Sequence, residues 1–216
     1  MRPLSSLLLA MASIVSLTHA SSLPATGNSD LPKTVLLVGD SLSSAHRIPP
    51  EAGWVNLLQQ RVDHATTTPP AIVNASRGGK TLTDALKELP ELIAAHHPQL
   101  IILELGANDA ILGASRQTLE QDMTQLIDLA QASGAKVAML GFEIPAKLDK
   151  GHCADMLQHV YTRVTQEKHV VLLPSLMAGI SNKPALLLDD GVHPTAAAQM
   201  RMLDNAWPTL RPLLIN

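Results

Sequence analysis

Two short segments at opposite ends of the chain hold side chains that could act together on an ester. Ser41 closes a Gly-Asp-Ser corner after an aliphatic run, and Asp190 lies three residues before His193. A serine hydroxyl becomes an effective nucleophile when a base removes its proton, and an imidazole serves as that base when a carboxylate fixes its tautomer. A turn at Gly191 brings the Asp190 carboxylate within reach of His193 Nδ1. We therefore expect Ser41 to be the nucleophile, His193 the base and Asp190 its orienting acid.

Attack on an acyl carbon also requires hydrogen-bond donors for the oxyanion, and loss of one such donor typically costs about 10²–10³ in rate. The candidates are the main-chain N–H of Ser41, a glycine N–H in the pair Gly78-Gly79, and the side-chain amide of Asn108. Each segment alone also has a plainer interpretation as a turn or a helix cap. Their joint placement favours a catalytic function, because four unrelated turns would otherwise have to share one sheet edge by accident.

Five aliphatic runs precede or separate these polar clusters, and they predict the strands that position them. The runs are TVLLVG (34–39), AIVNAS (71–76), QLIILELG (99–106), KVAMLGFEI (136–144) and HVVLLP (169–174). Their lack of alternation indicates burial on both faces. With helical segments between them, they predict an α/β three-layer sandwich, a flavodoxin-like five-stranded parallel sheet with helices on both faces. Ligands of such sheets bind beyond the carboxyl ends of the strands, where the polar clusters fall.

Apolar residues at helical spacing predict the covering helices. Their faces are Trp54, Leu57, Leu58 and Val62; Leu82, Leu86, Leu89 and Ile93; Leu119, Met123, Leu126, Ile127 and Ala130; and Ala197, Met200, Leu203 and Trp207. We expect Pro90 to divide the second helix and Pro208 to end the last one, because proline lacks the N–H that a helix interior requires. Thr195 is the expected N-cap of that last helix.

The N-terminus has the pattern of a secretory signal peptide over residues 1–20. Arg2 provides a positive start, residues 7–17 an apolar run, and Ala20 a small residue at the expected cleavage site. The apolar run is shorter than the roughly 20 residues that span a bilayer, so no stable membrane anchor is expected. The protein is therefore expected to be exported, to the periplasm or out of the cell. Residues 21–33 are polar and aperiodic, and we interpret them as a flexible lead-in to one domain spanning 34–216.

Charge and cysteine content narrow the range of partners. The chain has 16 basic and 19 acidic residues, and removal of Arg2 with the signal peptide leaves 15 basic residues and a net charge of −4. Nucleic acid is therefore not an expected partner. Cys153 is the single cysteine, which excludes an internal disulfide. His152 and His159 are too far apart for easy joint ligation, so no metal is expected, and a monomer is the default for this compact length.

These motifs together resemble those of the GDSL lipase/esterase family, also called the SGNH hydrolases. The resemblance rests on GDSL with Ser41, a glycine after NAS, GAND with Asn108, and DDGVHP with Asp190 and His193. It covers the chain from residue 34 to the C-terminal helix, and it is greatest to the exported bacterial thioesterase I/arylesterase group, which has lysophospholipase members. It implies an SGNH hydrolase domain with Gly79 and Asn108 as oxyanion donors and with no cofactor.

The expected substrate is a small-molecule or lipid ester, and apolar residues near the strand ends are candidates to bind its acyl chain. These are Ile111 and Leu112 after the GAND motif, and Phe142, Ile144 and Pro145 at the end of the fourth strand, with His46 beside the nucleophile turn. Ala45-His46 stand where the group often has a glycine and an aromatic residue. Ala107 and Ala110 stand where the group often has the glycines of Gly-Gly-Asn-Asp-Gly. Both departures bear on substrate preference.

Two other classes of function remain open from the sequence. A carbohydrate O-acetyl esterase would have the same fold, but an aromatic content of 2% disfavours sugar stacking. A flavodoxin-like binding module without catalysis would use the same sheet edge, but the loop after the first strand lacks a run of residues able to cradle a phosphate. An α/β-hydrolase is disfavoured because Ser43 replaces the second glycine of its Gly-x-Ser-x-Gly elbow.

Overall fold

A five-stranded, all-parallel sheet forms the centre of the protein in the computed structural model, which describes residues 32–149, 151 and 153–215. The strands are β1 (Thr34–Gly39), β2 (Ala71–Asn74), β3 (Leu100–Glu104), β4 (Lys136–Leu140) and β5 (Val171–Leu173). Their order, β2-β1-β3-β4-β5, is that of flavodoxin-like sheets, as predicted. The predicted signal peptide (1–20) and residues 21–31 of the predicted lead-in lie outside the described residues.

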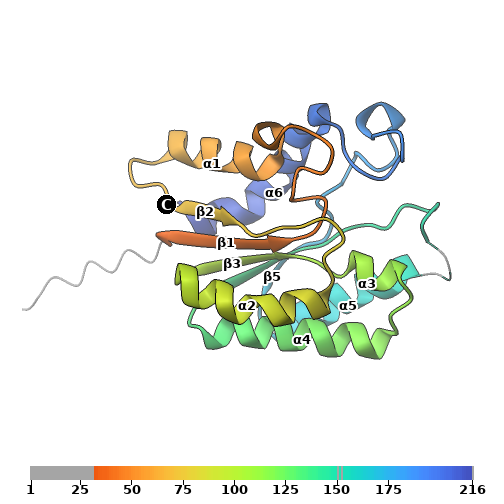
Figure 1. Cartoon of the computed structure of the whole chain (residues 1–216), viewed down its shortest axis with the longest axis horizontal. Coiled ribbons are helices and arrows are strands. Elements are labelled where there is room, and N and C mark those ends of the chain that lie inside the picture. Colours follow the sequence, from red (N-terminus) through yellow and green to blue (C-terminus); the bar gives the residue numbers. More distant parts are fainter. Residues whose placement is uncertain (1–31, 150, 152, 216) are drawn as a thin grey trace, which may run out of the picture.

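Helices cover both faces of this sheet and make three layers (Figure 1). One face carries α1 (Trp54–Ala65) and α6 (Gln199–Leu214); the other carries α2 (Leu82–His96), α3 (Ala107–Ile111), α4 (Arg116–Ala132) and α5 (Cys153–Glu167). Three single-turn 3₁₀ helices are η1 (Pro50–Ala52), η2 (Pro184–Leu186) and η3 (Ala196–Ala198). Within the described ranges, every helix falls short of the length and apolarity that a membrane span requires. The predicted three-layer sandwich is thus confirmed.

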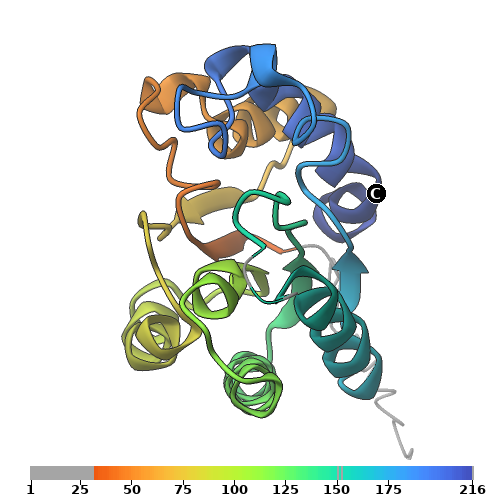
Figure 2. The same ribbon diagram turned by 90° about the vertical axis from the view of Figure 1, so that its right-hand side faces the viewer.

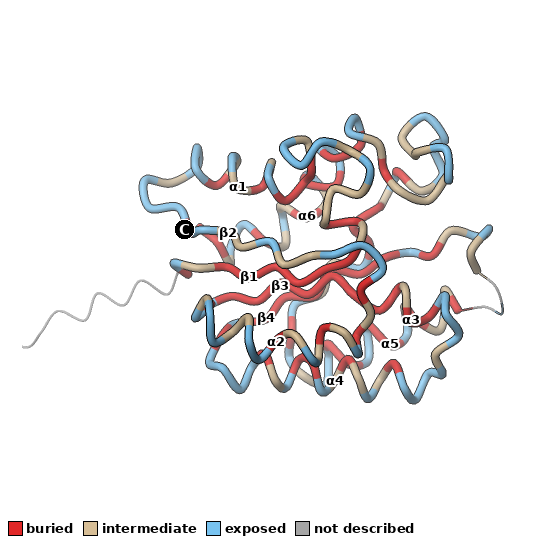
Figure 3. The backbone as a smooth tube through the Cα atoms, viewed as in Figure 1, coloured by how far each residue is buried: buried red, intermediate tan, exposed pale blue. Residues whose placement is uncertain are grey.

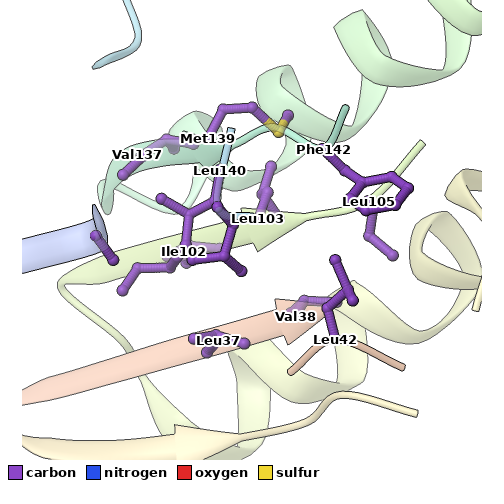
Figure 4. Close-up of a cluster of buried hydrophobic side chains, with 14 of the residues drawn as sticks. Leu37, Val38, Leu42, Ile102, Leu103, Leu105, Val137, Met139, Leu140 and Phe142 are labelled. Carbon is purple, nitrogen blue, oxygen red and sulfur yellow. The ribbon is translucent and has the colours of Figure 1, made fainter. Parts of the chain in front are cut away.

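Burial is greatest in the central strands, which appear as a red band between the helical layers in Figure 3. All five residues of β3 and the last five of β1 are buried, and their side chains pack with those of β4 (Figure 4). β2 and β5 differ from the prediction, because their residues are exposed or only half-buried. These two are the edge strands, so each lacks a neighbour on one side.

Two expectations about proline were wrong. Pro90 lies inside the continuous helix α2, and Pro208 lies inside α6, which runs on to Leu214. Both prolines are exposed, so their rings do not have to fit into the core, while buried neighbours such as Leu89 and Leu210 hold each helix in place.

The N-terminal part of the last helical segment also differs from the prediction. Thr195 precedes η3 and makes no side-chain cap. The buried face of α6 contains Met202, Leu203 and Ala206, whereas Met200 is 48% exposed, so the predicted face was partly out of register.

Strand register and contacts of α6 bring the two ends of the chain to the same sheet edge. Gly39 pairs with Glu104, so β1 and β3 end at the same level. The Trp54 N–H donates to Gln199 Oε1 over 3.0 Å and joins the start of α1 to the start of α6. The segment before α6 therefore passes beside the loop that follows β1. Figure 2 looks onto this side of the molecule, where the carboxyl ends of the strands point toward the viewer.

Candidate active site

The loop after β1 presents Ser41 at the carboxyl edge of the sheet. The Leu42 N–H donates to Asp40 Oδ1 over 3.0 Å, and the Ser44 N–H donates to the Asp40 carbonyl over 3.1 Å. Asparagine and aspartate side chains favour such turns, because their oxygen accepts a hydrogen bond from the main-chain N–H two residues later. Asp40 thus shapes the turn that leaves Ser41 only partly buried.

The segment before α6 forms a tight loop that carries Asp190 and His193. The Leu188 N–H donates to the His193 carbonyl over 2.8 Å, and an isolated antiparallel bridge joins Leu187 to Pro194. Gly191, with φ of 62°, makes the reversal inside this loop. These hydrogen bonds hold the loop in one conformation, although it contains neither a helix nor a strand.

Ser41, His193 and Asp190 form a continuous hydrogen-bonded chain. Ser41 Oγ and His193 Nε2 are 2.9 Å apart, and His193 Nδ1 and Asp190 Oδ2 are also 2.9 Å apart. An ionised carboxylate only accepts hydrogen bonds, which assigns the ring proton to Nδ1 and leaves Nε2 as the acceptor for the Ser41 hydroxyl. This is the arrangement in which an imidazole takes a proton from a nucleophile.

The surroundings of Asp190 keep its carboxylate ionised. Burial acts to raise its pKa, but hydrogen bonds from the His193 and Val192 N–H groups and from the His193 ring outweigh burial, so the pKa lies well below its usual value. The two N–H groups donate to Oδ1 over 2.9 and 2.7 Å. Arg47 adds a positive charge 3.5 Å from Oδ2.

A second set of contacts joins the loop after β2 to the loop after β3. Asn108, in α3, donates from Nδ2 to Asp40 Oδ2 and to the Lys80 carbonyl, each over 3.0 Å. Gly79 has φ of 73°, a conformation that side chains rarely adopt, although a Cβ there would meet nothing within 4 Å. Among the described residues, the N–H groups of Ser41, Gly78 and Gly79 have no protein acceptor. These three N–H groups are therefore candidate donors for an oxyanion, and one of them belongs to Ser41 itself.

Lys80 is a buried cation that sequence reasoning missed. Its side chain donates to the Ala75 carbonyl over 2.7 Å and lies 2.6 Å from Glu88 Oε2 in α2. These contacts tie both ends of the loop that carries Gly79 to the helix behind it. No feature of the sequence distinguishes this lysine from an exposed one.

Two carboxyl groups are buried beneath the turn that carries Ser41. Glu104, the last residue of β3, accepts from the Asp40 N–H over 3.3 Å and from Ser43 Oγ over 2.9 Å. Burial raises the pKa of Asp40 to about 6, and burial together with the Asp40 charge raises the pKa of Glu104 well above its usual value. A Cβ on Gly39 would lie 3.0 Å from Glu104 Oε2, so glycine allows this close approach. Sequence reasoning missed Glu104, although a glutamate within LIILELG was a visible signal.

A cavity of about 260 Å³ opens beside Ser41 and His193. Its lining residues are Asp40, Ser41, Leu42, Ala107, Asn108, Ile111, Phe142, Leu148, Val192 and His193. Of the residues predicted to bind substrate, Ile111 and Phe142 line it. Ile144 and Pro145 do not line it, and neither does Leu112, which is 77% exposed. Leu148 and Val192 were not foreseen.

His46 packs against the His193 ring, with ring centroids 4.3 Å apart, and does not line this cavity. A larger cavity of about 460 Å³ lies between the loop after β1, α1 and β2, but neither Ser41 nor His193 lines it. The chemistry and the first cavity therefore coincide, and the larger cavity is separate from both.

The buried carboxyl pair predicts a pH-dependent stability. Because the pKa of folded Asp40 lies above its ordinary value of 3.8, its contribution to stability is complete below pH 3.8 and is lost as pH rises through about 6. Asp40→Asn changes the free energy of unfolding through altered hydrogen bonding by an amount that does not depend on pH. It also removes the ionisation of residue 40. In thermal melts, the Tm of the variant relative to that of the wild type should therefore be higher at pH 7.5 than at pH 4.5.

Asp155→Asn, a change at an exposed acid of α5, is the control and should shift Tm by the same amount at both pH values. A difference between Asp40→Asn and wild type that stays constant with pH would contradict the assignment of a buried, ionising pair.

Known proteins share this sequence and this fold. Residues 37–201 match the GDSL-like lipase/acylhydrolase family. The chain is 38% identical to the esterase TesA of Pseudomonas aeruginosa, over 84% of this chain and 90% of that protein. It is 33% identical to thioesterase 1/protease 1/lysophospholipase L1 of Escherichia coli K12, over 84% of this chain and 85% of that protein.

Crystal structures agree with the sequence relationship. TesA superposes with a TM-score of 0.80 over 84% of this chain and 99% of that chain, at 38% identity. The psychrotrophic esterase EstA of Pseudoalteromonas sp., in a structure inhibited by monoethylphosphonate, gives a TM-score of 0.78 at 29% identity, over 83% of this chain and 97% of that chain. The chain therefore belongs to the GDSL-like lipase/acylhydrolase family and is a carboxylic ester hydrolase with the SGNH α/β fold.

Proposed function

We propose that the protein cleaves acyl esters and thioesters with a Ser41–His193–Asp190 triad. The observation that carries the proposal is the hydrogen-bonded chain of these three side chains, with 2.9 Å at each step. His193 Nε2 takes the Ser41 proton as Ser41 Oγ attacks the carbonyl carbon. His193 then gives this proton to the leaving alcohol or thiol. In the second step His193 takes a proton from water, which attacks the acyl-enzyme, and returns it to Ser41 Oγ as the acid leaves.

The oxyanion is held by main-chain and side-chain donors around Ser41. We assign the N–H groups of Ser41 and Gly79, with Gly78 as the alternative glycine, and the Asn108 amide. Both N–H bonds of that amide already have acceptors in Asp40 and Lys80. One of them must become three-centred as the oxyanion forms. A fixed, preorganised amide can make that adjustment without moving, which is the condition for efficient stabilisation of developing charge.

The acyl chain occupies the cavity beside the triad. Ile111, Phe142 and Leu148 give this cavity a largely apolar wall. The described part of the wall contains no tryptophan or tyrosine for sugar stacking, which favours acyl esters over carbohydrate acetates. The names of the relatives, which include an arylesterase of Vibrio mimicus at 32% identity, are consistent with small aromatic leaving groups and with thioesters.

We also propose that the protein acts as an exported monomer. The N-terminal pattern of Arg2, an apolar run and Ala20 supports export through a signal peptide. The physiological substrate would then be an ester met in the periplasm or outside the cell.

Replacement of Ser41 tests the catalytic assignment. Ser41→Ala should lower kcat for p-nitrophenyl esters by about 10⁴-fold or more, because the nucleophile is absent. A fluorophosphonate probe should label the wild type and fail to label the variant. Ser44→Ala, three residues along the same loop, is the matched control and should retain labelling. Labelling that persists in Ser41→Ala would show that another residue is the nucleophile.

A series of p-nitrophenyl esters tests the acyl cavity. Each methylene that enters an apolar cavity contributes about 0.8 kcal/mol, so kcat/KM should rise by up to about fourfold per methylene until the cavity is filled. Ile111→Ala should flatten this rise and change acetate hydrolysis little. The control Val171→Ala, on the far edge strand, should preserve the wild-type profile. A profile that is highest for acetate and falls with each added methylene would favour the O-acetyl esterase alternative.

A further inference from the structure

His46 is held against the catalytic histidine by an unusual stretch of backbone. Its neighbours Ala45 and Arg47 have φ of 56° and 58°, in the left-handed region that residues other than glycine rarely occupy. Such conformations persist where the surrounding structure fixes them, and they occur often at functional sites. Between these two residues, the His46 ring packs at 4.3 Å from the His193 ring. A Cβ on Gly78 would lie 3.9 Å from His46 Nδ1, so the loop after β2 also comes close to this ring.

This packing gathers three groups that bind transition metals. One ring nitrogen each from His46 and His193 and one carboxylate oxygen from Asp190 all lie within 4.8 Å of one another. Among the described residues, no other set of histidine, cysteine and acidic side chains is as close. Two imidazoles and a carboxylate, with a further position open, form a common ligand set for zinc.

We propose that His46, Asp190 and His193 form an inhibitory site for zinc or a similar late first-row metal ion. Tetrahedral zinc with bonds of about 2.0–2.2 Å holds its ligand atoms about 3.3 Å apart. His193 Nδ1 and Asp190 Oδ2, at 2.9 Å, need to separate by a few tenths of an ångström. His46 supplies the remaining movement by rotation of its half-buried side chain.

Nearby cations set the character of this site. Arg47 lies 3.5 Å from Asp190 Oδ2, and Lys147 donates to the Asp190 main-chain carbonyl. Both charges oppose a dication. A hard ion such as Mg²⁺, which prefers oxygen ligands, gains little from two imidazoles and is excluded, whereas zinc gains from both nitrogens. The opposing charges keep binding reversible, so the metal regulates the enzyme and does not reside in it.

The bound metal blocks catalysis by occupying groups that the reaction requires. It takes the charge of Asp190 and a lone pair on His193 Nδ1, so the proton that Nδ1 carried moves to Nε2, and Nε2 can no longer accept the Ser41 proton. The inhibitory effect rests on the proposed triad, whereas the metal site depends only on the three ligands. Chelation of the metal restores the original hydrogen bonds.

Zinc titration of wild type and of His46→Ala tests the proposal, with each rate expressed relative to the same protein without metal. Zinc should inhibit the wild type and slow its fluorophosphonate labelling, EDTA should reverse both effects, and equal Mg²⁺ should have none. Removal of the His46 ligand should weaken inhibition by at least about 10–100-fold, the loss that is typical when a group that only supports a ligand is removed. His46→Gln repeats the test if the alanine variant does not fold, and His64→Ala, at an exposed histidine of α1, should retain wild-type sensitivity.

Calorimetric titration with zinc separates this proposal from the proposed function, because it requires no activity. We compare Ser41→Ala with the double variant Ser41→Ala/His46→Ala. Zinc binding that depends on His46 supports the site even if the protein hydrolyses no ester. Wild type and His46→Ala that bind zinc equally, or that zinc inhibits equally, would overturn the proposal, as would a wild type that zinc neither binds nor inhibits.

Discussion

The hydrogen bond between Ser41 and His193 joins two residues that are 152 positions apart, and the site depends on the forces that keep them together. β1 and β3 end in register, which fixes the level of the Ser41 turn. The Trp54–Gln199 hydrogen bond and the packing of α6 on α1 fix the position of the segment that carries His193. Because these contacts join residues far apart in the sequence, the site depends on the tertiary fold and not on local structure alone.

Beneath that bond, the protein keeps polar groups where an apolar core would be more stable. Asp40 and Glu104 are buried together, and burial raises the pKa of both. Burial places Asp40 where its carboxylate shapes the turn at Ser41 and accepts a hydrogen bond from the amide of Asn108. Buried polar networks of this kind cost stability and give a fixed arrangement of donors, which is the property that oxyanion stabilisation requires. His46, the further ligand of the proposed metal site, packs against His193 in the same region.

The sequence was sufficient for the features that local chemistry determines. Unbroken aliphatic runs identified the five strands, the polar cluster after the first strand identified Ser41, and the cluster before the last helix identified Asp190 and His193. Features that depend on tertiary packing were missed. Pro90 and Pro208 continue their helices because their rings face solvent, and the burial of Lys80 depends on Glu88 in the next helix. Leu148 lines the cavity from a loop without periodicity, so no pattern could identify it.

A crystal structure of the protein after reaction with a phosphonate ester would test the central claim most directly. The account predicts phosphorus bonded to Ser41 Oγ, with the phosphoryl oxygen within about 3.2 Å of the main-chain nitrogens of Ser41 and Gly79 and of Asn108 Nδ2. His193 Nε2 should remain within hydrogen-bond distance of a phosphonate oxygen. An adduct on another residue, or a phosphoryl oxygen that points into solvent away from all three donors, would contradict the account.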